Sequence, residues 1–271
     1  MVDEFLKLAG AARIYDLGQP YFVGMPHFPT HPPFLFSLNK KHGDLVLANE
    51  GSSAAETLTL GGHVGTHIDA LCHFSCAGKM FGGVRPSQTY GGGVEQLSVD
   101  TIAPMLRRGV LLDAAAHQKA DTLPVDFTVT PDHLDRIAHA QGVEIRPGDI
   151  VLLRTGWATF WNDQKQYITG GSGAQAAGPG PELPGAKWLS SRKVFAVGAD
   201  TIAFERVPSR NMDVHIHLLV ESGIHIIEAL NLEDLARDHV YEFAFVAVPM
   251  KIRGGTGSPL RPLALAAQPR P

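Results

Sequence analysis

The chain has 271 residues, of which 44% are hydrophobic and 18% are charged, and its formal net charge is −4. This composition is typical of a soluble globular protein, and we expect a single domain over residues 1–271. The charge offers no basic patch for nucleic acid, and no apolar run approaches the roughly 20 residues of a membrane-spanning helix. The start has no secretory pattern, and the two cysteines, Cys72 and Cys76, imply no disulfide framework. We therefore expect a cytoplasmic protein without nucleic-acid or membrane partners.

The chain alternates between apolar strand patterns and helix signals. A helix is expected from Thr130-Pro131 to about Gln141, with Thr130 as its cap and Gly142 after its end, and a second from about Asp213 to Glu221. The stretch 169–185 is rich in Gly and Pro and predicts a loop, and residues 254–271 predict a C-terminal tail rich in Pro, Gly and Ala. Runs rich in Val, Ile, Leu and Phe predict buried strands at 109–115, 149–157, 194–200 and 242–252. This mixture predicts an α/β domain.

The segment "HVGTHIDALCHF", residues 63–74, carries the strongest chemical signal. His63, His67, Asp69 and His73 supply imidazole nitrogens and a carboxylate, which are ligands for Zn²⁺ or Mn²⁺. Burying several polar groups among apolar neighbours costs a few kcal/mol each unless something pairs with them. The cluster therefore predicts a metal site.

The spacing of these residues constrains the backbone. All four have odd numbers, so an extended strand would direct them to one face. A straight strand would separate His63 from His73 by roughly 33 Å, which is too far for one ion. We therefore expect the segment to bend at glycines such as Gly65, with His67 and Asp69 as the pair best placed to share one ion.

A second histidine–carboxylate pairing follows in "DVHIHLLVESGIHIIEAL". His215 and His217 lie on the predicted second helix, and Glu228 lies on a short apolar run that predicts a strand. Spacing alone favours a surface histidine and a solvent-facing glutamate here.

Other hydrolase classes fit less well. A thiol enzyme using Cys72 with His73 is disfavoured because adjacent strand residues point to opposite faces. The chain has no G-x-S-x-G elbow, and its glycine-rich stretches lack the Lys-Ser/Thr of a phosphate loop.

The segment "HVGTHIDALCH" resembles the H-x-G-T-H-x-D-x-P-x-H signature of the metal-dependent cyclase-like hydrolases, the family of bacterial kynurenine formamidase and isatin hydrolase. Leu71 stands where the signature has proline. The stretches "GDIVLLRTGW" and "VHIHLLVESGIHIIEALNLEDL" are similar to further segments of that family, so the resemblance runs from about Ile14 to Ile252.

The resemblance implies a swivelling-type β/β/α domain with a mixed sheet and flanking helices, commonly in a homodimer or larger assembly. It implies that His63, His67 and Asp69 hold a first divalent metal, Zn or Mn. His215, or alternatively His217, and Glu228 would serve a second metal or the proton transfers. His73 would be a general base or a ligand of the second site, and we take His73 and Glu228 as the proton-carrying groups.

The function implied is hydrolysis of an amide or ester bond in an aryl formamide, cyclic amide or lactone by a metal-activated hydroxide. The substrate is then a small, aromatic or cyclic molecule. Aromatic side chains available for its pocket are Phe22, Phe28, Phe34, Phe74, Phe81 and Trp157. The alternative is a non-enzymatic domain that binds a metal or a small ligand.

Overall fold

A nine-stranded mixed sheet is the centre of the computed structural model, which describes residues 2–173 and 175–267. Four neighbouring strands, β7, β9, β11 and β12, run parallel, and the strands on both sides of them pair antiparallel. In spatial order the sheet contains β1 (Ala12–Asp16), β15 (Leu263–Ala267), β13 (Glu242–Ala247), β7 (Met105–Asp113), β9 (Ile150–Arg154), β11 (Ala196–Ala199), β12 (His225–Glu228), β4 (His67–Asp69) and β14 (Gly257–Pro259).

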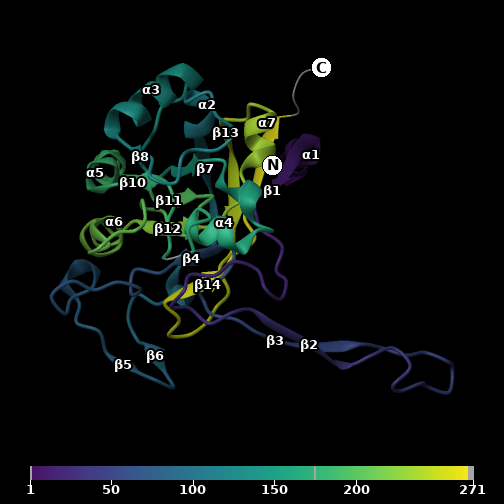
Figure 1. The fold of residues 1–271 in the computed structure, drawn as a ribbon. Helices are drawn as coiled ribbons and strands as arrows, with labels where there is room; N and C mark the ends of the chain where they lie inside the picture. The colour runs from purple at the N-terminus through teal and green to yellow at the C-terminus, as the bar shows by residue number, and fades with distance from the viewer. Residues whose placement is uncertain (1, 174, 268–271) are drawn as a thin grey trace.

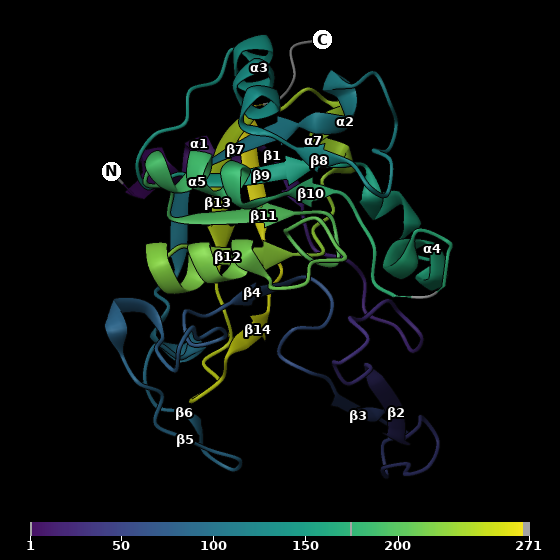
Figure 2. The same cartoon turned by 60° about the vertical axis from the view of Figure 1, so that its left-hand side comes forward.

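Helices flank this sheet on both sides (Figures 1 and 2). The helical segments are α1 (Val2–Ala11), η1 (Phe81–Gly83), η2 (Val99–Thr101), α2 (Ala114–His117), α3 (Pro131–Gln141), η3 (Trp157–Phe160), α4 (Gln164–Thr169), α5 (Leu183–Ser191), α6 (Asp213–His215), the π-helix η4 (Ile216–Ser222) and α7 (Glu233–Arg237). None of the helices in the described part of the chain is long and apolar enough to cross a membrane.

Three small two-stranded sheets lie outside the main one. They pair β2 (Leu35–Lys40) with β3 (Ala55–Thr59), β5 (Gln88–Thr89) with β6 (Gly93–Val94), and β8 (Thr128–Val129) with β10 (Gly180–Pro181). The β2–β3 hairpin reaches away from the body of the molecule in both views (Figures 1 and 2).

The two faces of the main sheet bury separate apolar clusters. Alternate residues point to opposite faces, so Leu111 and Leu152 pack in one cluster with Leu235 of α7. Their neighbours Leu112 and Leu153 pack in the other, against α3, α5 and η4. The near-continuous apolar runs in these strands follow from burial on both faces, as in parallel sheets generally.

The expected α/β class with a mixed sheet and flanking helices is confirmed. The helix α3 forms as expected, since Thr130 accepts from the His133 amide and Gly142 ends the helix in the left-handed region at φ 66°. The expected strands form with shorter or shifted bounds. The second expected helix is α6 followed by the π-helix η4, which ends at Gly223.

Two expectations about irregular segments are wrong. The stretch 169–185 contains β10 and the start of α5. Proline does not prevent the helix, because Pro184 lies in its first turn, where proline is tolerated. The expected tail from residue 254 instead supplies β14 and β15 to the main sheet. The prolines of this segment lie at the strand boundaries and do not prevent strand formation. Pro259 is the last residue of β14, and Pro262 directly precedes β15. Residues 268–271 lie outside the described residues.

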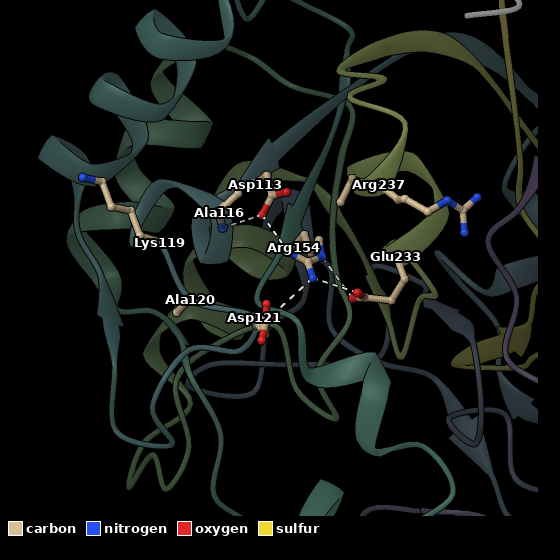
Figure 3. A pocket seen from close by; sticks show the side chains of 9 residues that line it. Asp113, Ala116, Lys119, Ala120, Asp121, Arg154, Glu233 and Arg237 are labelled. Atoms are coloured by element: carbon tan, nitrogen blue, oxygen red, sulfur yellow. Dashed lines mark hydrogen bonds and ion pairs between the residues drawn. The ribbon is translucent and has the colours of Figure 1, made fainter.

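The Arg-Thr-Gly turn after β9 joins several elements. Arg154 lies between Asp113 at the end of β7 and Glu233 of α7, with Nη1 3.0 Å from Asp113 and Nη2 2.7 Å from Glu233 (Figure 3). The next two residues, Thr155 and Gly156, donate their backbone N–H groups to the buried Asp200 after β11. A cavity of about 370 Å³ opens beside Arg154. The guanidinium of Arg154 is already paired with the carboxylates of Asp113 and Glu233. We therefore interpret Arg154 as a structural clamp, that is, a cation that holds β7, β9 and α7 together.

Replacing Arg154 by leucine should lower the free energy of unfolding by about 3 kcal/mol, because it leaves Asp113 and Glu233 without their buried cation. The exposed pair of Arg136 with Asp132 on α3 is the matched control, and Arg136→Leu should cost less than about 1 kcal/mol. Urea unfolding of both variants measures the difference. Equal losses would contradict the clamp.

Candidate metal centre

Two antiparallel strands from distant parts of the chain bring the first donors together. The pairing of β4 with β12 sets Glu228 directly opposite His67, and residues opposite each other share one face of a sheet. Asp69 is two residues from His67 and therefore points to the same face. All three side chains are buried. The His67 Nε2 atom lies 3.4 Å from the Glu228 carboxylate and 3.6 Å from that of Asp69.

The chain bends immediately before β4. Gly65 has φ 70°, and a Cβ on it would lie 2.4 Å from the ring of Tyr21. The Gly65 carbonyl accepts a hydrogen bond of 2.7 Å from His67 Nδ1. Because a carbonyl can only accept, Nδ1 carries a proton, so in the neutral imidazole Nε2 is the nitrogen with the free lone pair, and it faces Asp69 and Glu228. The bend therefore sets both the position and the tautomer of His67.

His63 returns to the cluster across this bend. Its Nδ1 lies 2.6 Å from Asp69 Oδ1, and its Nε2 hydrogen-bonds the Thr256 hydroxyl at 2.9 Å. The neighbouring Gly257 leaves room for the ring, because a Cβ there would lie 2.4 Å from His63. Thr256 and Gly257 belong to the segment expected as a tail, so that segment supports the site.

His215 approaches from α6 and faces Oδ2 of Asp69, whereas His63 faces Oδ1. Its Nε2 lies 3.3 Å from Glu228 and 3.8 Å from Asp69. Behind it, the buried Glu205 accepts from both the backbone N–H of His215, at 3.1 Å, and its Nδ1, at 2.7 Å. His217 points elsewhere, with Nδ1 2.7 Å from Glu221 and Nε2 2.8 Å from Ser190.

Two groups of potential metal donors share Asp69. One comprises His63, His67 and Asp69, and the other comprises Asp69, His215 and Glu228, with the donor atoms of each group within 4.8 Å of one another. Among the described residues, His67 Nε2 and Asp69 Oδ2 are buried atoms without a hydrogen-bond partner. Leaving such atoms unpaired costs about 1–3 kcal/mol each. The unpaired atoms and the mixed nitrogen and oxygen donors both fit a divalent cation.

The protonation equilibria of the cluster favour positive charge at its centre. Burial opposes ionisation of Asp69, but His73 and His63 outweigh this effect and hold its pKa well below the ordinary value. Burial likewise opposes ionisation of Glu228, and its contacts with His215 and His67 lower its pKa to about 2. Burial disfavours the charged His215, yet Glu205 and Glu228 raise its pKa to about 10. Asp69 and Glu228 are thus both anionic at neutral pH.

His73 lies beside the donors but is electrostatically different from them. Its ring stacks on that of His63 with centroids 3.9 Å apart. Burial, together with the nearby His63 and His215, lowers the pKa of His73 to about 3. Its imidazole is therefore neutral at neutral pH.

A cavity of about 370 Å³ opens onto the cluster. Phe28, Phe74, Ile202 and Met212 supply apolar walls, while His73, His215 and Glu228 contribute to the polar side. Of the aromatic candidates, Phe28 and Phe74 line this cavity. The others pack in the fold, with Phe34 and Trp157 buried, Phe22 half-buried beside them and Phe81 against Gly223.

Sequence reasoning missed several residues of this site. Glu205 lies in a loop without any recognisable motif, and Thr256 lies in the expected tail. His31 belongs to no motif either, but it lines the cavity and donates from Nδ1 to the His63 carbonyl at 3.2 Å. The one available signal is the abundance of histidine, which does not distinguish His31 from the others.

Cys72 does not have the environment of a nucleophile. Its Sγ donates to the Gly255 carbonyl at 3.7 Å, and burial raises the pKa of the thiol to about 11. A thiolate is therefore disfavoured at neutral pH. The fold and the cluster together define an α/β protein with a buried divalent-metal centre beside a small-molecule cavity, which is the arrangement of a metal-dependent hydrolase.

Comparison with known proteins agrees with this class. Residues 15–206 match the model of the cyclase family, whose description is "Putative cyclase". Isatin hydrolase of Roseibium aggregatum is 29% identical over 214 residues, covering 77% of this chain and 73% of its own. Kynurenine formamidase of Bordetella petrii is 22% identical over 249 residues, covering 92% and 96%. The chain belongs to the cyclase family, which confirms the resemblance of its histidine motif.

Solved structures share the fold. A crystal structure described as a novel cyclase superposes with a TM-score of 0.86 and 28% identity, covering 96% of this chain and 89% of that one. Isatin hydrolase A from Ralstonia solanacearum superposes with a TM-score of 0.75 and 26% identity, covering 98% and 95%.

Replacing Gly65 by alanine should reduce the divalent metal that the purified protein retains and lower its free energy of unfolding by about 2 kcal/mol or more. Alanine is strained at positive φ, and its Cβ would push against Tyr21 and displace the carbonyl that orients His67. Gly82→Ala is the matched control, because Gly82 has φ 69° and a Cβ added to it would meet no atom within 4 Å. Metal analysis by mass spectrometry and thermal unfolding test this, and equal metal content in the two variants would contradict it.

Proposed function

We propose that this protein is a hydrolase that uses a divalent metal to open an amide, cyclic amide or ester bond in a small aromatic or cyclic substrate. The observation that carries the proposal is the pair of donor groups sharing Asp69 at a cavity, with buried Nε2 of His67 and Oδ2 of Asp69 unpaired among the described residues. Relatives named isatin hydrolase and kynurenine formamidase support the same reaction class.

In this proposal, His63, His67 and Asp69 would hold a first ion, Zn or Mn. His215 and Glu228 would complete a second position together with Asp69 or, with one ion bound, would serve the proton transfers. His215 is preferred over His217 because both ring nitrogens of His217 have hydrogen-bond partners outside the cluster. Its Nδ1 bonds to Glu221 and its Nε2 bonds to Ser190. When bound, the metal supplies a Lewis acid that polarises a carbonyl and lowers the pKa of a water molecule.

The protein side chains then handle protons. His73 lines the cavity and its ring stacks on that of His63 with centroids 3.9 Å apart, and for this position beside the donors we assign it as the general base. Glu228 is held by a hydrogen bond of 2.8 Å from the Phe204 backbone N–H. With one ion bound, this fixed orientation suits Glu228 to taking a proton from the attacking water and passing it to the leaving nitrogen or oxygen.

The cavity supports the substrate class. Its volume of about 370 Å³ is near the lower end of small-molecule sites, and the walls of Phe28, Phe74, Ile202 and Met212 suit an aromatic or cyclic body. A non-enzymatic domain that binds a metal or a small ligand is the alternative, and the relatives named as hydrolases favour the enzyme. We also propose a cytoplasmic location, supported by the free thiols of Cys72 and Cys76, and a homodimeric assembly.

The function is tested by assaying the metal-loaded protein against N-formylkynurenine, isatin and simple lactones, before and after a chelator. We expect turnover of at least one substrate class, its loss with the chelator, and its return with Zn²⁺ or Mn²⁺. His215→Ala should lower kcat/KM by at least about 100-fold, whereas His217→Ala, two residues away, should leave it nearly unchanged. Stoichiometric metal without turnover of any of these compounds would favour the binding domain.

Replacing His73 by glutamine should separate catalysis from metal binding. A general base contributes about 100- to 10,000-fold, so kcat should fall within that range while the metal content stays at the wild-type level. Steady-state kinetics and metal analysis on the same preparation measure both. A loss of metal would instead make His73 a ligand.

A further inference from the structure

The substrate cavity offers few polar groups away from the metal donors. Of the described residues that line it, none is Lys or Arg, so a substrate carboxylate that does not reach the metal finds no cation there. Apart from the donor cluster and His73, the polar side chains of the lining are those of Thr30, His31 and Ser209. Recognition of a substrate beyond its scissile carbonyl therefore depends on hydrogen bonds with these three side chains.

His31 differs from the two hydroxyl groups because its polarity is fixed. A hydroxyl group can donate or accept, so Thr30 and Ser209 do not distinguish substrate donors from acceptors. The Nδ1 atom of His31 donates to the backbone carbonyl of His63 at 3.2 Å. In the neutral imidazole, Nε2 is then the nitrogen with the free lone pair, and it can only accept. Among the described residues, Nε2 of His31 has no hydrogen-bond partner.

The ring of His31 is held in place from several directions. Its centroid lies 5.7 Å from that of Phe28 and 5.4 Å from that of His63. The His31 backbone N–H donates to the Phe28 carbonyl at 2.9 Å. The next residue, Pro32, packs on Gly61, where an added Cβ would lie 3.0 Å from the Pro32 ring. An acceptor that is already fixed loses little conformational entropy when a ligand binds, so it can discriminate between ligands.

The position of His31 suits the amide group that is to be cleaved. Its ring is next to that of His63, one of the proposed metal donors, and both residues line the cavity. Only two bonds separate the oxygen of an amide from its nitrogen, so an amide whose carbonyl reaches the metal brings its N–H close to the same wall. An ester or an N-alkylated amide has no N–H and leaves Nε2 without a donor. An acceptor that is desolvated and left unpaired is unfavourable.

We propose that His31 is a specificity-determining residue that accepts a hydrogen bond from the amide N–H of the substrate. This proposal deepens the proposed function and rests on it for its kinetic test. It narrows the substrate class to amides that carry a hydrogen on nitrogen, which include unsubstituted lactams and aryl formamides. N-alkylated amides and lactones of the same size are then poorer substrates.

The kinetic test compares isatin with N-methylisatin, because the methyl group removes the amide N–H. The metal-loaded protein is assayed at about pH 8, where an ordinary imidazole is neutral. Each kcat/KM is divided by the rate constant for alkaline hydrolysis of the same compound, which corrects for intrinsic reactivity. We expect the wild type to favour isatin by about 10- to 100-fold, the effect of leaving one buried acceptor unpaired.

Three variants separate the hydrogen bond from the shape of the cavity. His31→Phe keeps a ring but has no acceptor, so its preference should fall below about threefold. His31→Gln keeps an acceptor and should retain a preference between those of the wild type and His31→Phe. His27→Phe is the matched control, because His27 also has Nδ1 beside a carbonyl, 3.1 Å from that of Phe28, but does not line the cavity. Its preference should equal that of the wild type.

Equal normalised values for the two compounds in the wild type would overturn the proposal. A His31→Phe variant that keeps the full preference would also overturn it, because the cavity would then exclude the methyl group by size. Metal analysis on the same preparations gives a further check. His31→Phe should retain the metal content of the wild type, and a loss of metal would contradict a role in substrate recognition.

Ligand binding distinguishes this proposal from the proposed function. Calorimetry with oxindole and N-methyloxindole measures recognition of a lactam N–H and needs no turnover. The wild type should bind oxindole at least about 10-fold more tightly, and His31→Phe should bind both lactams equally. If this result holds but no compound is hydrolysed, recognition by His31 stands and the proposed function fails. If isatin and N-methylisatin are hydrolysed equally well, the reverse holds.

Discussion

The antiparallel pairing of β4 with β12 is the constraint on which the site depends. It joins two segments about 160 residues apart in the sequence and sets His67 opposite Glu228. On its other side β4 pairs with β14, and its middle residue, Ile68, is fully buried in the core. A slip of one residue would turn His67 and Asp69 into that core and Ile68 toward the cavity. The core therefore enforces the register that the donors require.

Fixed register alone does not orient the histidines, and each has a different partner behind it. His67 is oriented by the carbonyl of Gly65 and His63 by the hydroxyl of Thr256, both of which are uncharged. His215 is oriented by the carboxylate of Glu205. A carboxylate behind an imidazole raises its basicity as a ligand. The two donor groups that share Asp69 are therefore chemically unequal, with more negative charge around the one that contains His215.

The sequence contains the local part of this site but not its assembly. His67 and Asp69 can be predicted to share one site because they are two residues apart and an extended strand directs both to the same face. The bend near Gly65 can also be predicted, because the length of a straight chain limits which residues can meet. Leu71, the departure from the family signature, packs beside one core cluster and is not a donor. Cap residues likewise determine the bounds of α3, because capping involves residues within one turn of each other.

The parts that could not be predicted depend on contacts between distant segments. The choice of His215 over His217 depends on which side of a helix faces β4, and the interruption by a π-helix changes that geometry. The strands β14 and β15 are short and flanked by Gly and Pro, so only their pairing with β4, β1 and β13 distinguishes them from a tail. Glu205 orients His215 by a hydrogen bond, and no sequence motif around Glu205 indicates this role.

Chemistry and substrate recognition depend on different parts of this fold. The donors lie on strands buried from both sides, where packing holds atoms to fixed positions. Phe28 and His31 instead belong to the segment that leads into the exposed β2–β3 hairpin. Loops tolerate sequence change that a core strand does not. Substitutions in the segment before β2 can therefore alter the shape of the cavity without moving a donor.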